Sequence, residues 1–76
     1  MNLQDAFLNK CRLDKMKITI FLNSGYKLGG KVLGFDNYVI FFETEKGEHL
    51  IYKSSIASIS PSKHIRLFTK EDEKKD

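Results

Sequence analysis

The chain has 76 residues, one cysteine, and 13 basic against 10 acidic side chains, which give a net charge of +3. This length allows one small domain, which buries only about 60–65% of the surface that its unfolded chain exposes and is therefore marginally stable alone. The single cysteine excludes an internal disulfide, and Cys11, His49 and His64 lack the paired spacing of a zinc site. We expect no metal and no other cofactor, and we expect oligomerisation to supply stability.

The apolar segments are all short, and none approaches the ~20 residues of a membrane-spanning helix. No charged and then apolar leader opens the sequence, so we expect a cytoplasmic protein without membrane contact. The charge excess is +2 over residues 1–17, 0 over residues 18–60 and +1 over residues 61–76. A symmetric assembly would repeat this modest excess on one rim, where it would attract a polyanion.

Residues 3–13 have the spacing of an amphipathic helix, because Leu3, Phe7 and Cys11 recur at intervals of four. Asn2 is placed to cap the N-terminus of this helix, and Asp5 suits its first turn. We expect the helix to cover one open end of a small barrel, with a polar face that is free for additional contacts.

Five short segments with the composition or the alternation of β-strands follow the helix. Asp36 and Asn37 predict a tight hairpin turn, because both residue types tolerate positive φ and bond nearby backbone groups. Gly34 permits a bulge just ahead of that turn, and the adjacent Gly29 and Gly30 predict sharp curvature. Pro61 has no amide hydrogen and fixes the end of the last strand. The expected strands are residues 17–22, 26–33, 38–43, 49–53 and 56–60, with turns or links at residues 23–25, 45–48 and 54–55.

One helix followed by five short, bent strands predicts a mainly β protein with a partly closed antiparallel barrel, not a two-sheet sandwich. We expect the domain to span residues 1–68, with residues 62–68 as an extended segment through Ile65 and Leu67. Residues 69–76 are almost all charged, and we expect them to form a disordered tail.

The helix and two groups of residues after it resemble the Hfq family of bacterial Sm-like RNA chaperones. Residues 2–5 and 7–9 match the family's opening helix, residues 20–22, 25, 28, 30 and 35–38 its first Sm motif, and residues 50–53, 56 and 61 its second. The most specific feature is the helix-first order with both motifs at this separation. The resemblance implies a strongly bent five-stranded antiparallel Sm-like (SH3-like) barrel and a ring of six identical subunits.

The implied ring closes by pairing the fourth strand of one subunit with the fifth strand of the next. This pairing would bury the exposed edges of a sheet that is too small to be stable alone. The residues expected at the subunit interface are Ile51, Tyr52, Ile56 and Ile59.

The resemblance also implies a site for uridine-rich RNA around the pore of the ring. The Tyr38 ring would stack on a base, Lys53 would donate to a base or a phosphate, and Gln4 would read a uracil edge. Asp36 and Asn37 have the alternative role of turn formers, and Ser54 stands where the family usually has a histidine. The expected residues of this site are Gln4, Asp36, Asn37, Tyr38, Lys53 and Ser54.

Adenine-rich RNA would bind the opposite face, through Phe21, Gly25, Tyr26, Leu28 and Gly29. Core packing and a subunit contact are competing interpretations of Phe21. A phosphate-binding rim would comprise Asn9, Lys10, Arg12 and Lys15, and its alternative is a solvated charged face. Some relatives have a glutamine at the position of Gly29 and a second basic residue at that of Leu13.

The implied function is that of an RNA chaperone that pairs small regulatory RNAs with mRNAs in post-transcriptional regulation and the stress response. No Gly-x-Ser-x-Gly motif, phosphate loop or paired acid–base geometry supports an enzyme. The alternative is a small SH3-like protein-interaction barrel, which would be monomeric and would have no affinity for oligonucleotides.

Overall fold

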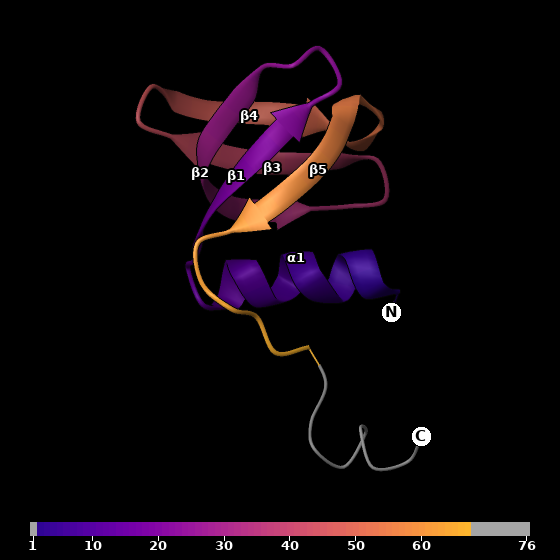
Figure 1. Cartoon of the computed structure of the whole chain (residues 1–76), viewed down its shortest axis with the longest axis vertical. Helices are drawn as coiled ribbons and strands as arrows, with labels where there is room; N and C mark the ends of the chain where they lie inside the picture. The colour runs from indigo at the N-terminus through magenta and orange to yellow at the C-terminus, as the bar shows by residue number, and fades with distance from the viewer. Residues whose placement is uncertain (1, 68–76) are drawn as a thin grey trace.

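An antiparallel sheet follows a single N-terminal helix in the computed structural model, which describes residues 2–67 (Figure 1). The elements are α1 (Leu3–Leu13), β1 (Lys17–Leu22), β2 (Lys27–Phe35), β3 (Val39–Thr44), β4 (Gly47–Tyr52), the 3-10 turn η1 (Lys53–Ser55) and β5 (Ile56–Pro61). The predicted architecture of one helix and five antiparallel strands is confirmed. The predicted tail at residues 69–76 and the domain boundary beside it lie outside the described residues.

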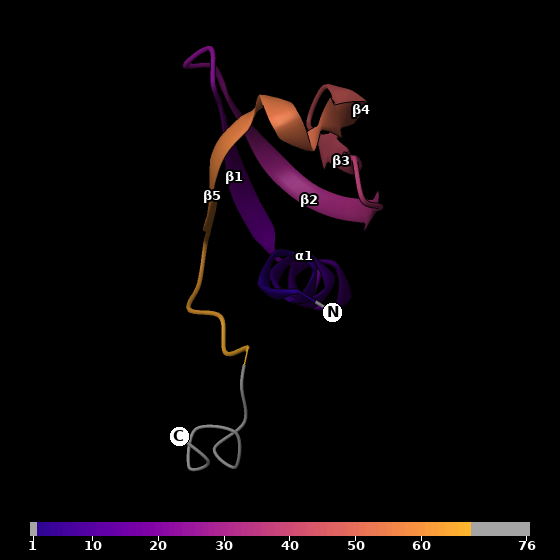
Figure 2. The same cartoon turned by 90° about the vertical axis from the view of Figure 1, so that its right-hand side faces the viewer.

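The strand order is β4-β3-β2-β1-β5, so β4 and β5 form the two edges of the sheet. Figure 2 shows β1 and β5 on one side and β3 and β4 on the other, with β2 curving from one to the other. Within residues 2–67 no backbone pairing joins the two edges, so the barrel is closed only in part. Each edge therefore keeps a row of unpaired N–H and C=O groups, which is a template for pairing with another chain.

β2 belongs to both sides of the sheet because it curves along its length (Figure 2). Its residues 27–31 pair with β1, whereas residues 31–35 pair with β3. A Cβ atom at Gly30 would overlap the carbonyl oxygen of Glu43, so the close approach of the two backbones requires glycine. A Cβ atom at Gly29 would meet open space. The predicted curvature is confirmed, and it depends on Gly30.

The turn between β2 and β3 is held by the Asp36 side chain. Its carboxylate accepts hydrogen bonds from the backbone N–H of Tyr38 at 2.7 Å and of Val39 at 2.9 Å. These donors hold the pKa of the Asp36 carboxyl below its ordinary value. Neither Asp36 nor Asn37 has positive φ, so the expected turn forms through side-chain bonding instead. The expected bulge is present as a register shift just ahead of Gly34.

Some boundaries differ from those expected from the sequence. β4 begins at Gly47 and not at residue 49, because the φ of 123° at Gly47 permits a shorter turn after β3. Residues 62–67 add no strand to the sheet, but Ile65 packs against the core.

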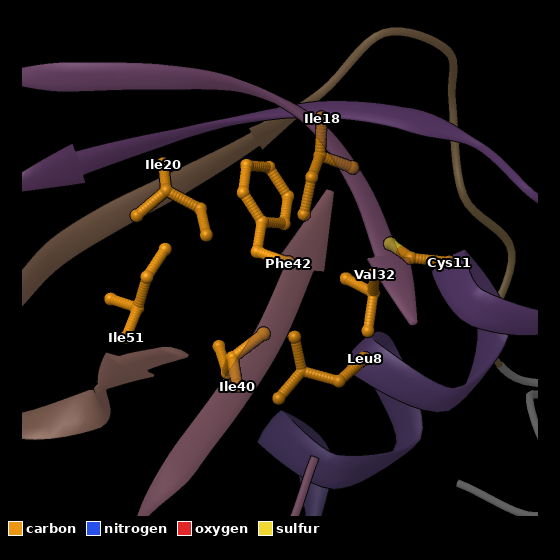
Figure 3. Packing of buried hydrophobic residues seen from close by; sticks show 8 residues of the cluster. All are labelled: Leu8, Cys11, Ile18, Ile20, Val32, Ile40, Phe42 and Ile51. Carbon is orange, nitrogen blue, oxygen red and sulfur yellow. The ribbon is translucent and has the colours of Figure 1, made fainter. Parts of the chain in front are cut away.

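Eight buried side chains form the core between the bent sheet and α1 (Figure 3). α1 supplies Leu8 and Cys11 and lies across one end of the sheet, which confirms its predicted position (Figure 1). As expected, the Asn2 side chain caps α1 by accepting a hydrogen bond from the Asp5 N–H at 2.7 Å. Leu3 was expected on the buried stripe but is 61% exposed, because a four-residue spacing drifts around a helix of 3.6 residues per turn. The other core members are Ile18, Ile20, Val32, Ile40, Phe42 and Ile51.

Candidate functional site

The turn that carries Tyr38 lies beside the end of β4. The Lys53 N–H donates to the Tyr38 carbonyl at 2.8 Å and so fixes η1 against the β2–β3 turn. The Tyr38 side chain is 76% exposed, which leaves its ring accessible to a planar ligand. The structure thus brings together Asp36, Asn37, Tyr38 and Lys53, four residues that the sequence predicts for one site.

Lys53 is held by two contacts and is not a free surface lysine. Its Nζ lies 3.3 Å from Oδ1 of Asp5 and 5.5 Å from the centroid of the Phe35 ring, and its side chain is 13% exposed. A cation over an aromatic face gains about 0.5–1 kcal/mol at exposed sites. These contacts tie the end of β4 to α1 and to β2. Sequence patterns do not identify Asp5 or Phe35 as partners, since Asp5 and Lys53 are 48 positions apart.

A groove of about 430 Å³ runs between α1 and β5, and both Gln4 and Lys53 line it. Its walls are otherwise mainly apolar and include Leu3, Phe7, Ile40, Ile56 and Ile59. Apolar walls with a few placed polar groups are typical of sites for small flat ligands. The groove therefore offers an amide and an ammonium group beside a surface on which a heterocycle can lie.

Ser54 lies outside this groove. Its carbonyl accepts a hydrogen bond from Asn23 Nδ2 at 3.0 Å, and the Ser55 carbonyl accepts one from the Asn23 N–H at 2.8 Å. Both bonds attach η1 to the loop between β1 and β2. Ser54 thus contributes its backbone carbonyl to the position of the turn, and the residue itself is exposed.

The loop between β1 and β2 is a tight hairpin connection that places Tyr26 at the tip of the sheet. Gly25 has a φ of 96°, and its N–H donates to the Leu22 carbonyl at 2.9 Å. This geometry is typical of a type I turn followed by a left-handed residue. Tyr26 comes next and is 62% exposed. The hydrogen bond of the Gly25 N–H stabilises this turn.

A second groove, of about 890 Å³, lies between residues of β1 and β2 and residues of the β3–β4 hairpin. Tyr26, Leu28 and Gly29 line it, and so do Lys31 and His49, which no sequence motif marks as site residues. The bend in β2 brings Lys31 here, and His49 Nε2 lies 3.2 Å from the Thr44 hydroxyl oxygen. Gly25 is not part of its lining.

Phe21 also lies outside both grooves. It is 36% exposed on the outer face of β1. The interpretation that Phe21 packs in the core of its own subunit is therefore wrong. An exposed ring on the outer face of a strand is available to a base or to another subunit.

The rim residues of α1 make contacts within the helix and with its C-cap residue, Asp14. Arg12 Nη2 donates to Asn9 Oδ1 at 2.7 Å, and Lys10 Nζ lies 3.3 Å from Asp14 Oδ2. Lys15 follows the helix with a φ of 51° and is exposed. Because Asp14 balances Lys10, the net positive charge of the rim comes from Arg12 and Lys15.

The residues expected at a subunit interface differ in exposure. Tyr52 is 60% exposed, whereas Ile51 beside it is 7% exposed and belongs to the core. Ile51 can therefore contribute to an interface only through its backbone. Ile56 and Ile59 on the opposite edge are half-buried and pack against the core from its margin.

Among residues 2–67, no group of three or more histidine, cysteine, aspartate or glutamate side chains could hold a metal ion. Cys11 is fully buried, and burial raises the pKa of its thiol. The described part of the chain contains no helix that is long and apolar enough to cross a membrane.

A sequence model of the Hfq protein family matches residues 3–66. The chain is 40% identical to the RNA-binding protein Hfq of Syntrophomonas wolfei over an alignment of 76 residues. This alignment covers 100% of this chain and 93% of that protein. It is 45% identical over 67 residues to the RNA-binding protein Hfq of Bacillus velezensis, with 88% of this chain and 92% of that protein covered.

Solved structures show the same fold. A crystal structure of the pleiotropic translational regulator Hfq superposes with a TM-score of 0.76 at 29% identity and covers 78% of this chain and 98% of that one. An Hfq protein from Anabaena sp. superposes with a TM-score of 0.71 at 22% identity, covering 78% and 95%, and this likeness concerns the fold alone. The predicted Sm-like architecture is confirmed.

Proposed function

The chain belongs to the Hfq family, and from this premise we propose that it binds single-stranded RNA in the cytoplasm and promotes pairing of small regulatory RNAs with mRNAs. Its relatives are named for RNA binding, and as a member of their family it is not an enzyme. The observation that carries the proposal is that Gln4 and Lys53 line one groove, while the Lys53 N–H bonds the carbonyl of the exposed Tyr38.

The proposed functional unit is a ring of six subunits in which β4 of one subunit pairs with β5 of the next. Within the described subunit each edge strand is paired on one side only, β4 with β3 and β5 with β1, and this supports the arrangement. The exposed Leu50 and Tyr52 on β4 would be covered in the ring. Ile56 and Ile59 would contribute from β5. A head-to-tail interface of this kind closes into a ring when its rotation permits.

Uridine-rich RNA, or an RNA 3′ end, binds around the pore of the proposed ring. Each base stacks on Tyr38, which is worth about 1–3 kcal/mol per base. The Gln4 amide reads a uracil edge, because it offers both a donor and an acceptor. Lys53, oriented by Asp5 and Phe35, donates to a base carbonyl or a phosphate. Repetition around the ring raises the effective concentration of each weak contact.

Adenine-rich RNA binds the opposite face, where Phe21 and Tyr26 present exposed rings. Leu28 and Gly29 line the groove beside Tyr26 and are its proposed contacts with the RNA. The rim adds a salt-dependent attraction for phosphates that is independent of base sequence.

Fluorescence anisotropy with labelled oligo(U) and oligo(A) at one fixed salt concentration tests the proposal. We expect the protein to bind both oligonucleotides, and we expect unlabelled oligo(U) to displace labelled oligo(U) but not labelled oligo(A). Binding of neither oligonucleotide would contradict the proposal. If the protein were also monomeric, the result would favour an SH3-like protein-interaction barrel.

A further inference from the structure

Charge is segregated across the sheet. β1, β2 and β5 contain three lysines, Lys17, Lys27 and Lys31, and no acidic residue. The β3–β4 hairpin contains three glutamates against a single lysine, Lys46. One half of the sheet is therefore basic although residues 18–60 are neutral in sum. An RNA backbone that crosses the sheet would be attracted to the first half and repelled by the second.

Within the basic half, Lys17 and Lys31 are directly opposite each other in the antiparallel pairing of β1 with β2. Directly opposed residues on one face have Cβ atoms about 5 Å apart, and like charges in such positions destabilise the sheet. Both side chains are exposed. The ion pairs of residues 2–67 are Lys10 with Asp14 and Lys53 with Asp5, so neither lysine of this pair is neutralised at close range.

The same face carries the groups that a nucleic acid strand requires next to a phosphate site. Phe21 is four residues beyond Lys17 on β1, about 13 Å at the usual rise per strand residue. Phe21 is opposite Ser58 of β5, and Thr19, midway between Lys17 and Phe21, is opposite Ser60. A strip of the outer sheet face thus runs from two ammonium groups past hydroxyl groups to an exposed aromatic ring.

We propose that Lys17 and Lys31 together bind a backbone phosphate of the single-stranded RNA whose base stacks on Phe21. This proposal rests on the proposed site for adenine-rich RNA. It adds a path for the RNA backbone, which would run along β1 toward the bend in β2. The anion relieves the repulsion between two ammonium groups that the strand register holds together. Lysine suits this role, because its ammonium is a compact charge that contacts phosphate without reading a base.

Glu43 limits this phosphate site. It is opposite Lys31 on the β3 side, so Lys31 stands between Lys17 and a carboxylate in one row across three strands. The row continues to Glu48 on β4, where the RNA backbone would meet a second carboxylate. Removing the Glu43 charge should therefore raise the affinity for oligo(A), whereas removing either lysine should lower it.

Anisotropy of labelled oligo(A) over a series of salt concentrations tests the proposal. We expect Lys17→Ala and Lys31→Ala each to weaken binding by about fivefold, the upper range for an exposed charge contact. Each should also reduce the slope of log affinity against log salt by about 0.7, the value for one phosphate of a single strand. Lys31→Arg, which keeps the charge, should retain most of the affinity, and Glu43→Gln should increase it.

The matched control is Lys46→Ala, which removes the same charge from the acidic hairpin across the groove. We expect it to change oligo(A) affinity less than about twofold, because the three glutamates of this hairpin repel the RNA backbone from the surroundings of Lys46. If Lys17→Ala and Lys31→Ala behave like Lys46→Ala while Phe21→Ala weakens binding, the lysine pair is not the phosphate site although the adenine face stands. If Phe21→Ala and Tyr26→Ala have no effect, or if oligo(A) does not bind, the proposed adenine face fails and this proposal is overturned with it.

Discussion

The two proposed RNA-binding faces are built in different ways. The uridine site joins Gln4, Tyr38 and Lys53 from three elements, and the ion pair of Lys53 with Asp5 holds part of it in place. On the outer face of β5, β1 and β2, strand register instead places Lys17, Lys31 and Phe21, and the loop between β1 and β2 places Tyr26. Substitutions should therefore act on the uridine site through geometry and on the outer face through loss of single, separable contacts.

The largest effect is expected from breaking the ring, on which both faces depend. The Ser62 N–H donates to Lys17 of β1, so alternation along the chain turns the Ile59 N–H toward the free edge of the sheet. Ile59→Pro should remove a donor from the subunit interface while leaving the bonds to β1 intact. We expect gel filtration to show dissociated subunits and circular dichroism to show retained β structure.

Ile59→Val is the control for this experiment, because it keeps the N–H and most of the apolar side chain. It should assemble like the parent protein. An Ile59→Pro variant that still forms a ring would show that this edge of β5 is not at the interface.

The next largest effect is expected at the uridine site. Tyr38→Ala removes a stacking surface worth about 1–3 kcal/mol per base, and should weaken oligo(U) binding by about tenfold or more. Lys53→Ala should also weaken it, because the amine and its two anchoring contacts are lost together. Anisotropy at fixed salt measures both, with oligo(A) affinity as the internal control. Unchanged oligo(U) affinity in both variants would place the site elsewhere.

A smaller and separable effect is expected on the opposite face. Phe21→Ala and Tyr26→Ala should each weaken oligo(A) binding by about fivefold, the lower range for loss of one stacked base. Oligo(U) affinity should not change, because neither Phe21 nor Tyr26 lines the groove that contains Gln4 and Lys53. If the same variants weaken oligo(U) equally, the two faces are not independent and the comparison between them is wrong.

The smallest effect per subunit concerns Ser54, where the family usually has a histidine. Ser54→His would add a donor that can also stack or carry charge, and we expect a gain of about 0.5 kcal/mol in each engaged subunit. Oligo(U) binding should tighten in anisotropy measurements, whereas oligo(A) binding should stay the same. An unchanged or weaker affinity for oligo(U) would mean that the Ser54 side chain does not face the bound RNA.

The sequence predicts those parts of the fold and the candidate site that depend on local patterns. The helix cap at Asn2, the turn at Asp36 and the alternation of β1 follow from short-range preferences, and the structure confirms them. The exposure of Leu3 shows where a pattern of spacing alone misplaces a residue.

Long-range placement is less accessible to sequence reasoning. The pairing of Lys53 with Asp5 links positions 48 apart, and the pairing of Lys17 with Lys31 requires knowledge of the strand register. Likewise, the need for glycine at position 30 becomes evident only from the carbonyl of Glu43 that approaches it. These contacts are set by how the sheet bends, and no local pattern encodes them.

Native mass spectrometry of the unmodified chain, with and without short oligo(U), tests the central claim most directly. We predict an assembly of about six times the subunit mass of 8.8 kDa, and a further species heavier by one oligonucleotide when RNA is present. A stable 8.8 kDa monomer at micromolar concentration that carries no RNA would contradict both the ring and the binding function.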